Sequence, residues 1–117
     1  MSKGKARIDL LQGTLDLLIL RTLVFGPSHG HDVAKQIRRV SEDVLHVETG
    51  SLYPALHRLE SQGWISSKWD ISDKGKRAKY YQLTRSGRKQ LFAERSKWKA
   101  FARAIGLILD PAGQEGS

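Results

Sequence analysis

Hydrophobic residues follow a helical period in the first half of the chain. From about Leu11 to Phe25 they occur on most sides of a helix, which predicts burial on most sides, partly by a second copy of the chain. Gly26 and Pro27 end this helix. A second helix is expected from about Gly30 to Glu42, capped by Ser28, and its inward residues are Val33, Ala34, Ile37 and Val40.

The segment from Gly50 to Trp64 predicts a third, amphipathic helix. Proline is tolerated in the first turn of a helix, so a cap at Ser51 would place Pro54 correctly. Gly63 suits the left-handed position that ends a helix. The apolar underside consists of Leu52, Ala55, Leu56 and Leu59. The outer face presents Tyr53, Pro54, His57, Arg58 and Ser61.

After Gly63 the period changes to two. Residues 64–71 and 79–84 are rich in strand-forming residues and are separated by the turn residues 72–75, so they predict a hairpin. One face of its first strand carries Ile65, Ser67, Trp69 and Ile71, and the tip carries Lys74, Lys76, Arg77 and Lys79. Two helices joined by a turn and followed by a basic hairpin predict a winged helix-turn-helix, a mostly α fold with a small β-hairpin (α+β).

A long last helix is expected from Arg85 to about Leu109, capped by Thr84. Its seam-like residues are Leu91, Trp98, Phe101, Ile105 and Ile108, and Glu94 interrupts the pattern. This spacing predicts dimerisation through the helix, although packing against its own domain is the alternative. The chain is then expected to divide into a basic flexible arm (1–9), the winged helix-turn-helix domain (10–84), the dimerisation helix (85–110) and a flexible tail (111–117).

Composition narrows the choice of function. The 117 residues suffice for one domain, and 20 Lys and Arg against 12 Asp and Glu give a net charge of +8. Such a basic domain most often binds nucleic acid, and an anionic membrane is the second possibility. The chain has no cysteine, which excludes disulfides, zinc fingers and thiol catalysis. The densest apolar run, Leu15 to Phe25, is too short to span a bilayer, so a cytoplasmic protein is expected.

The third helix offers the chemistry that reads base edges in a major groove. Ser51, Tyr53, His57 and Arg58 supply donors and acceptors, and Pro54 supplies an apolar contact to a thymine methyl group. Arg58 could instead bind phosphate. The hairpin cations suit the neighbouring backbone or minor groove, and weaker backbone contacts are expected from Lys35, Arg38 and Arg39. For each of these charges the alternative is an ordinary solvated side chain.

Enzymatic chemistry has no support in the sequence. It lacks a Gly-rich phosphate loop, paired carboxylates at catalytic spacing and a serine-elbow motif. His29, His31 and Asp32 are a weak metal-binding pattern, because zinc requires four ligands. Neither a metal nor a cofactor is therefore expected. His29 is expected at a helix start, where it packs or hydrogen-bonds locally.

Four segments resemble the PadR family of bacterial transcriptional regulators, in particular its short subgroup with a single C-terminal helix. They are residues 11–20, 26–30, 48–60 and 80–91, and Gly50-Ser-Leu-Tyr-Pro-Ala-Leu is the most specific part. The resemblance implies a homodimeric winged-helix repressor that binds an inverted-repeat double-stranded DNA operator and is often released by a small effector. This chain departs from the family in having His31 where an aromatic residue is common, and a lysine-rich hairpin tip.

Two questions stay open at this stage. Phe92, Trp98 and Phe101 could line a flat apolar cavity between subunits for a small hydrophobic or aromatic effector, with Trp98 as the candidate contact, or they could simply pack the dimer core. The alternative to a specific repressor is a winged-helix module for protein–protein or non-specific nucleic-acid contact, which would not discriminate between DNA sequences.

Overall fold

The computed structural model of the protein describes residues 8–9 and 12–110. In chain order its elements are β1 (Ile8–Asp9), α1 (Gln12–Thr22), the 3₁₀ turn η1 (Leu23–Phe25), β2 (Ser28–His29), α2 (Gly30–Val40), β3 (Leu45–His46), α3 (Thr49–Ser61), β4 (Ile65–Ile71), β5 (Arg77–Leu83) and α4 (Arg85–Leu109). This is the α+β winged helix-turn-helix that the hydrophobic pattern predicts.

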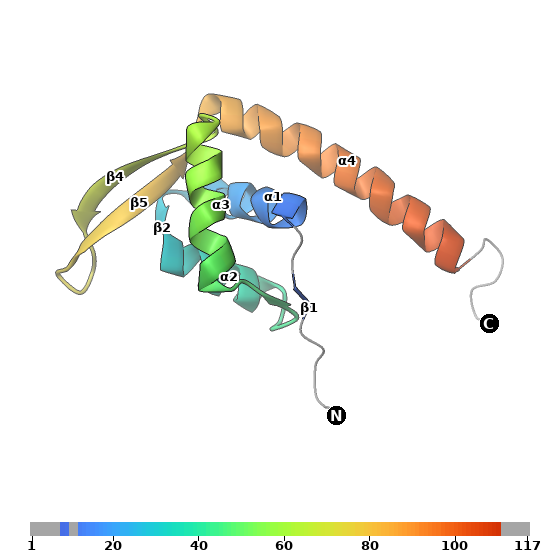
Figure 1. Ribbon diagram of the computed structural model, residues 1–117, viewed down its shortest axis with the longest axis horizontal. Coiled ribbons are helices and arrows are strands. Elements are labelled where there is room, and N and C mark those ends of the chain that lie inside the picture. Colours follow the sequence, from blue (N-terminus) through green and yellow to red (C-terminus); the bar gives the residue numbers. More distant parts are fainter. Residues whose placement is uncertain (1–7, 10–11, 111–117) are drawn as a thin grey trace.

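Helices α1, α2 and α3 enclose the core, while the β4–β5 hairpin projects on one side and α4 on the other (Figure 1). The underside of α3 is the best-buried surface, because Ala55, Leu56 and Leu59 are fully inaccessible to solvent. They pack with Ile19 and Leu20 of α1 and with residues of α2, β4, β5 and α4 in one cluster. The core therefore fixes which side of α3 faces outward.

The hairpin has the predicted turn but a longer second strand. β4 and β5 pair antiparallel from Ile65 opposite Leu83 to Ile71 opposite Arg77. Arg77 pairs with Ile71 directly beside the turn, whereas Lys79, also predicted to lie at the tip, is opposite Trp69, two residues further along β5. The two-residue strand β2 adds to the other side of β5. It was not predicted because two residues are too few to display a period.

A second short pairing joins β1 to β3 in parallel. Ile8 and Asp9 fall in the segment predicted to be a flexible arm, and the structure instead pairs them with Leu45 and His46. The rest of the arm, residues 1–7, and the tail, residues 111–117, lie outside the described residues.

Three ends of the first two helices differ from the predictions. α2 is capped by His29, whose Nδ1 accepts from the backbone N–H of Asp32 at 3.3 Å, and not by Ser28, which is part of β2. α2 ends at Val40, because Glu42 and Asp43 adopt left-handed backbone conformations with φ of 55° and 68°. The last turn of the predicted first helix is 3₁₀, from Leu23 to Phe25.

The prediction that Ser51 caps α3 is wrong. The helix begins at Thr49 with Glu48 in the cap position, so Pro54 lies inside it. Proline there cannot donate to the carbonyl of Gly50.

α4 is fastened to the end of α3 and then leaves the domain. The Thr84 hydroxyl accepts from the N–H of Gly87 at 3.0 Å, as predicted for its cap, and donates to the Gly63 carbonyl at 2.7 Å. Ser86 donates to the same carbonyl at 2.9 Å. Leu91 still belongs to the core of its own chain, whereas most of the helix beyond it is exposed. This part of α4 projects away from the other helices (Figure 1).

Candidate nucleic-acid interface

The outer face of α3 is free of the core from Ser51 to His57. Ser51, Pro54 and His57 are exposed, and Tyr53 retains 45% of its accessible surface. The Tyr53 ring lies against the backbone of Gly30 at the start of α2, since a Cβ atom on that glycine would be only 2.9 Å from the ring. Packing against Gly30 therefore supports the ring of an aromatic residue that remains nearly half exposed.

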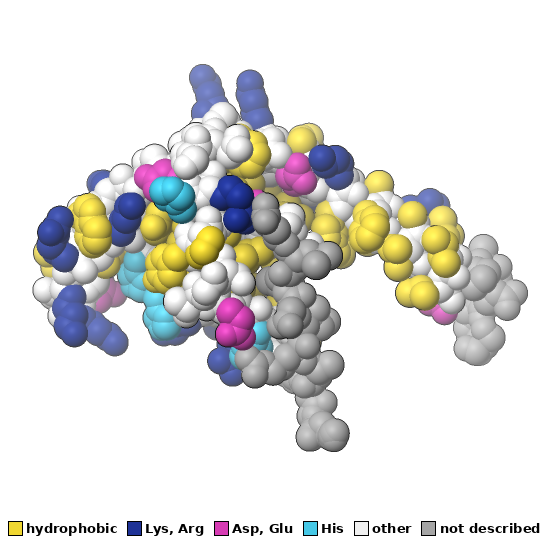
Figure 2. All heavy atoms as spheres, in the orientation of Figure 1, with side chains coloured by type: hydrophobic (Ala, Val, Ile, Leu, Met, Phe, Trp, Pro, Cys, Tyr) yellow, Lys and Arg dark blue, Asp and Glu magenta, His cyan; other side chains and the backbone are white. Residues whose placement is uncertain are grey.

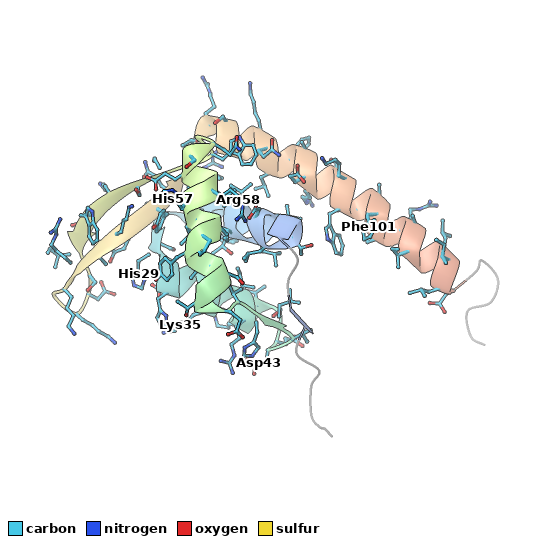
Figure 3. The ribbon with its side chains drawn as sticks, in the orientation of Figure 1. His29, Lys35, Asp43, His57, Arg58 and Phe101 are labelled. Carbon is cyan, nitrogen blue, oxygen red and sulfur yellow. The ribbon has the colours of Figure 1, made fainter. Side chains whose placement is uncertain are left out.

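Arg58 differs from its neighbours on α3. Its guanidinium donates to Asp16 of α1, with Nη2 at 2.5 Å from Oδ1 and Nε at 3.4 Å from Oδ2. Figure 3 shows His57 and Arg58 on opposite sides of α3, with Arg58 on the side of α1. The predicted set of base-reading residues therefore divides, because Arg58 already has a partner within the chain.

The hairpin cations divide in the same way. Lys74 and Lys76 occupy the exposed turn, whereas Arg77 lies over the Trp69 ring at 4.8 Å from its centroid. Lys79 has its Nζ 3.8 Å from a carboxylate oxygen of Glu60. The turn lysines are thus available to a partner molecule, while Arg77 and Lys79 also support the hairpin.

Between α3 and the hairpin lies a hollow of about 420 Å³. Its walls bring together aromatic and basic side chains from three elements, namely His31 of α2, Tyr53 of α3, and Trp69, Lys76, Arg77 and Lys79 of the hairpin. Trp69 was predicted only as a strand residue on one face with Ile65, Ser67 and Ile71, and the period could not show that it is 57% exposed. The arrangement can accept a polyanion with planar groups.

A network of polar groups holds the hairpin against α3. The Ser67 hydroxyl donates to Glu60, the carboxylate that also faces Lys79. Below it, burial raises the pKa of the Tyr81 hydroxyl above its usual value of 10.0, and the neighbouring Glu60 and Tyr53 raise it further. Tyr81 therefore stays neutral at physiological pH and adds no charge to the site.

The three α2 cations predicted to make weaker contacts with the DNA backbone do not all lie beside α3. A hollow of about 300 Å³ brings Lys35 and Arg38 beside Tyr53, together with His31 and His46. Arg38 also pairs with Asp43 at 2.8 Å. Arg39 is exposed, but it is not among the residues that line this hollow. Lys35, labelled in Figure 3, is exposed and lines this hollow together with Tyr53 of α3.

The four histidines lie on four different elements, β2, α2, β3 and α3. Among the described residues, no three His, Cys, Asp or Glu side chains are grouped so that they could hold a metal ion. His29 acts as the cap of α2, lies edge-on to Tyr80 with ring centroids 5.5 Å apart and has Nε2 at 3.3 Å from Asp32. The prediction that His29 packs and hydrogen-bonds locally at a helix start is confirmed.

The free part of α4 carries a second apolar surface. The exposed fractions of Trp98, Phe101, Ile105 and Ile108 are 45%, 62%, 39% and 74%. Their spacing of three, four and three residues places them on one stripe. Leu91, predicted to belong to the same intermolecular seam, is only 9% exposed and packs within its own chain, so that assignment is wrong for this residue.

Comparison with known proteins gives consistent results. The model of a family described as "Transcriptional regulator PadR-like family" matches residues 19–93. The chain is 34% identical over 97 residues to the transcriptional regulator Rv3488 of Mycobacterium tuberculosis, covering 83% of this chain and 87% of that protein.

Solved structures agree with the sequence relatives. A PadR family transcription regulator from Clostridium difficile is 33% identical, with a TM-score of 0.70, covering 81% of this chain and 97% of its own. The smu.1704 protein of Streptococcus mutans is 28% identical, with a TM-score of 0.78, covering 92% and 94%. Across the described part of the chain, no helix is both long enough and apolar enough to cross a membrane.

Proposed function

Because the chain belongs to the PadR-like family of transcriptional regulators, we propose that it is a dimeric repressor that binds an inverted-repeat operator in double-stranded DNA. Regulators of this family bind DNA and are not enzymes. The observation that carries the proposal is the outward face of α3, where His57 is exposed and Tyr53 lines a hollow walled by the basic hairpin.

In this proposal α3 enters the major groove. Ser51, Tyr53 and His57 provide hydrogen-bonding groups for base edges, and Pro54 provides an apolar contact. The hairpin turn, with Lys74 and Lys76, reaches the adjacent backbone or minor groove. Figure 2 supports this division, since Lys and Arg side chains gather at the hairpin end of the molecule.

Dimerisation is proposed to occur through α4. Its 25 residues span about 38 Å, and an apolar stripe on its free half is a poor surface for a monomer in water. Figure 2 shows hydrophobic side chains along this half of the molecule, and Phe101 points from α4 toward the side on which α1 lies (Figure 3). A two-fold pair presents two copies of α3 to two half-sites, which is how an inverted repeat is read.

A small hydrophobic or aromatic effector is proposed to act at the same stripe, with Trp98 as its contact. Trp98 is the largest exposed side chain of the stripe and would lie where two α4 helices meet. Phe92 is set apart from this group, because six residues along a helix turn it about 120° away from Trp98. An effector there would alter the dimer and, through it, the spacing of the two reading helices.

The test is a fluorescence-anisotropy titration with the DNA upstream of the protein's own gene and a scrambled duplex of the same length, at several salt concentrations. We expect saturable binding by two protomers per site and a preference of about a thousandfold over the scrambled DNA. Equal binding to both duplexes, falling steeply with salt, would mean that only charge is read and would replace the proposal with a non-specific basic module.

A further inference from the structure

Asp16 is an acidic residue set among leucines. It lies on α1 between Leu15, which is buried, and Leu17, which is half-buried, and its own side chain is only 20% exposed. The residue that it faces, Arg58, comes 42 positions later in the chain and is 32% exposed. Two nitrogens of the guanidinium approach the two carboxylate oxygens, which gives the pair a forked geometry.

This geometry restricts α3 in a way that leucine packing alone does not. Apolar contacts tolerate small rotations and shifts of a helix, whereas a two-point hydrogen bond between planar groups has a narrow range of distances and angles. Arg58 follows His57 directly in the sequence and comes one helical turn after Pro54. A constraint on Arg58 therefore fixes the rotation at which the outer face of α3 is presented.

We propose that Asp16 and Arg58 form a positioning pair for the DNA-reading face, and that Arg58 does not itself contact DNA. The inference rests on the proposed function and changes the role of one residue in it. The proposal also explains the presence of Asp16 near the DNA-reading face, where its negative charge by itself opposes binding to a polyanion.

The two roles of Arg58 predict opposite effects of the same substitution. If Arg58 bound DNA, Asp16 would compete for its guanidinium, and Asp16→Asn would both free the arginine and remove a repulsive charge, so affinity would rise. If Arg58 positions α3, Asp16→Asn loosens the helix and affinity falls despite the more favourable net charge. The sign of the change decides between them.

The experiment compares Asp16→Asn, Arg58→Gln and the double variant in the anisotropy titration with upstream DNA. Asp73→Asn, which removes an exposed acid from the hairpin turn, is the matched charge control. We expect each single variant to bind about tenfold more weakly and the double variant no more weakly than Arg58→Gln. Asp73→Asn should bind as tightly as the wild type or more tightly.

The salt dependence provides a second measurement. Loss of a phosphate contact lowers the slope of log affinity against log salt by about one, whereas loss of a positioning residue leaves the slope unchanged. We expect the wild-type slope for Arg58→Gln. Affinity of Asp16→Asn equal to or above that of the wild type, or a slope reduced by about one in Arg58→Gln, would overturn the proposal.

Folding is checked on the same samples by far-UV circular dichroism and thermal melting. Should Arg58→Gln fail to fold, Arg58→Lys keeps the charge and loses the fork. It should still bind several-fold more weakly, and wild-type affinity would count against the pair. Should the wild type show no preference for upstream DNA, the proposed function fails by itself. The pair is then judged on melting temperatures, where losses that simply add in the double variant would refute the coupling.

Discussion

At the scale of single residues, Tyr53 is partly packed against the domain and partly exposed. Its ring rests on Gly30 and nearly half of its surface stays accessible. We expect Tyr53→Ala to lower affinity for upstream DNA about tenfold or more, because a base-edge contact is worth about 1–3 kcal/mol. Anisotropy titration measures this, and the unfolding free energy should change by less than about 1 kcal/mol.

The control for Tyr53 lies at the far end of the same helix. Gln62 is exposed directly after α3, and it should tolerate replacement by alanine without a change in DNA affinity. Equal losses in the two variants would indicate a general disturbance of α3, and wild-type binding by Tyr53→Ala would remove Tyr53 from the reading face.

Two glycines of α4 lead to opposite predictions. A Cβ atom at Gly87 would lie 1.9 Å from the backbone carbonyl oxygen of Trp64, which also accepts from the N–H of Thr84, so the joint between α3 and α4 would have to open. We expect Gly87→Ala to cost about 3 kcal/mol of unfolding free energy. Gly106 has no such neighbour within 4 Å, and Gly106→Ala should stabilise the helix by about 1 kcal/mol.

Urea denaturation of both variants tests this contrast. A small loss in Gly87→Ala would mean that the contact between the start of α4 and Trp64 gives way easily. Because the stability of a dimer depends on protomer concentration, both variants are compared with the wild type at the same protein concentration.

At the scale of elements, the hairpin is proposed to contribute charge and α3 to contribute sequence discrimination. Replacing both Lys74 and Lys76 by alanine should weaken binding to upstream and scrambled DNA by similar factors, and should lower the salt slope by up to about two. Lys99→Ala, an exposed cation on α4, is the control. A selective loss on upstream DNA would instead assign base reading to the hairpin turn.

The elements themselves were largely predictable. The stripe of α3, the hairpin turn and the Thr84 cap are local signals, and each was found at its predicted position. The cap of α2 was not, because the pairing of Ser28 with Tyr81, more than fifty residues later in the chain, decides it. A sequence pattern carries no record of such a tertiary contact.

The sequence predicted which face of α3 is exposed, but not which of its charged residues pair within the chain. Helical period placed Tyr53 and His57 on the outer face, and the structure agrees on their exposure. The period could not distinguish Arg58 from them, because its partner Asp16 lies on another helix. Lys79 was likewise counted with the tip, although the register places it opposite Trp69 and beside Glu60. Ion pairs with residues of other elements therefore distinguish Arg58 and Lys79 from the exposed residues predicted beside them.

At the scale of the whole molecule, the apolar stripe of α4 is proposed to join two copies of the chain. Trp98→Asp would place a charge in that seam, so we expect the dimer dissociation constant to rise by about a hundredfold or more and DNA affinity to fall with it. Sedimentation velocity over a range of micromolar concentrations measures the first effect, and anisotropy titration with upstream DNA measures the second.

Arg103→Ala tests whether the stripe itself matters. It changes the net charge by the same amount, but helical spacing puts Arg103 about 140° from Trp98, on the far side of α4 from the stripe. It should leave the dimer intact. If DNA affinity falls in Trp98→Asp while sedimentation stays that of the wild type, Trp98 acts within one chain. If both variants dissociate, the interface surrounds α4 and is wider than the stripe. Only dissociation confined to Trp98→Asp, with the matching loss of operator binding, fits a two-fold pair whose spacing is set by this seam.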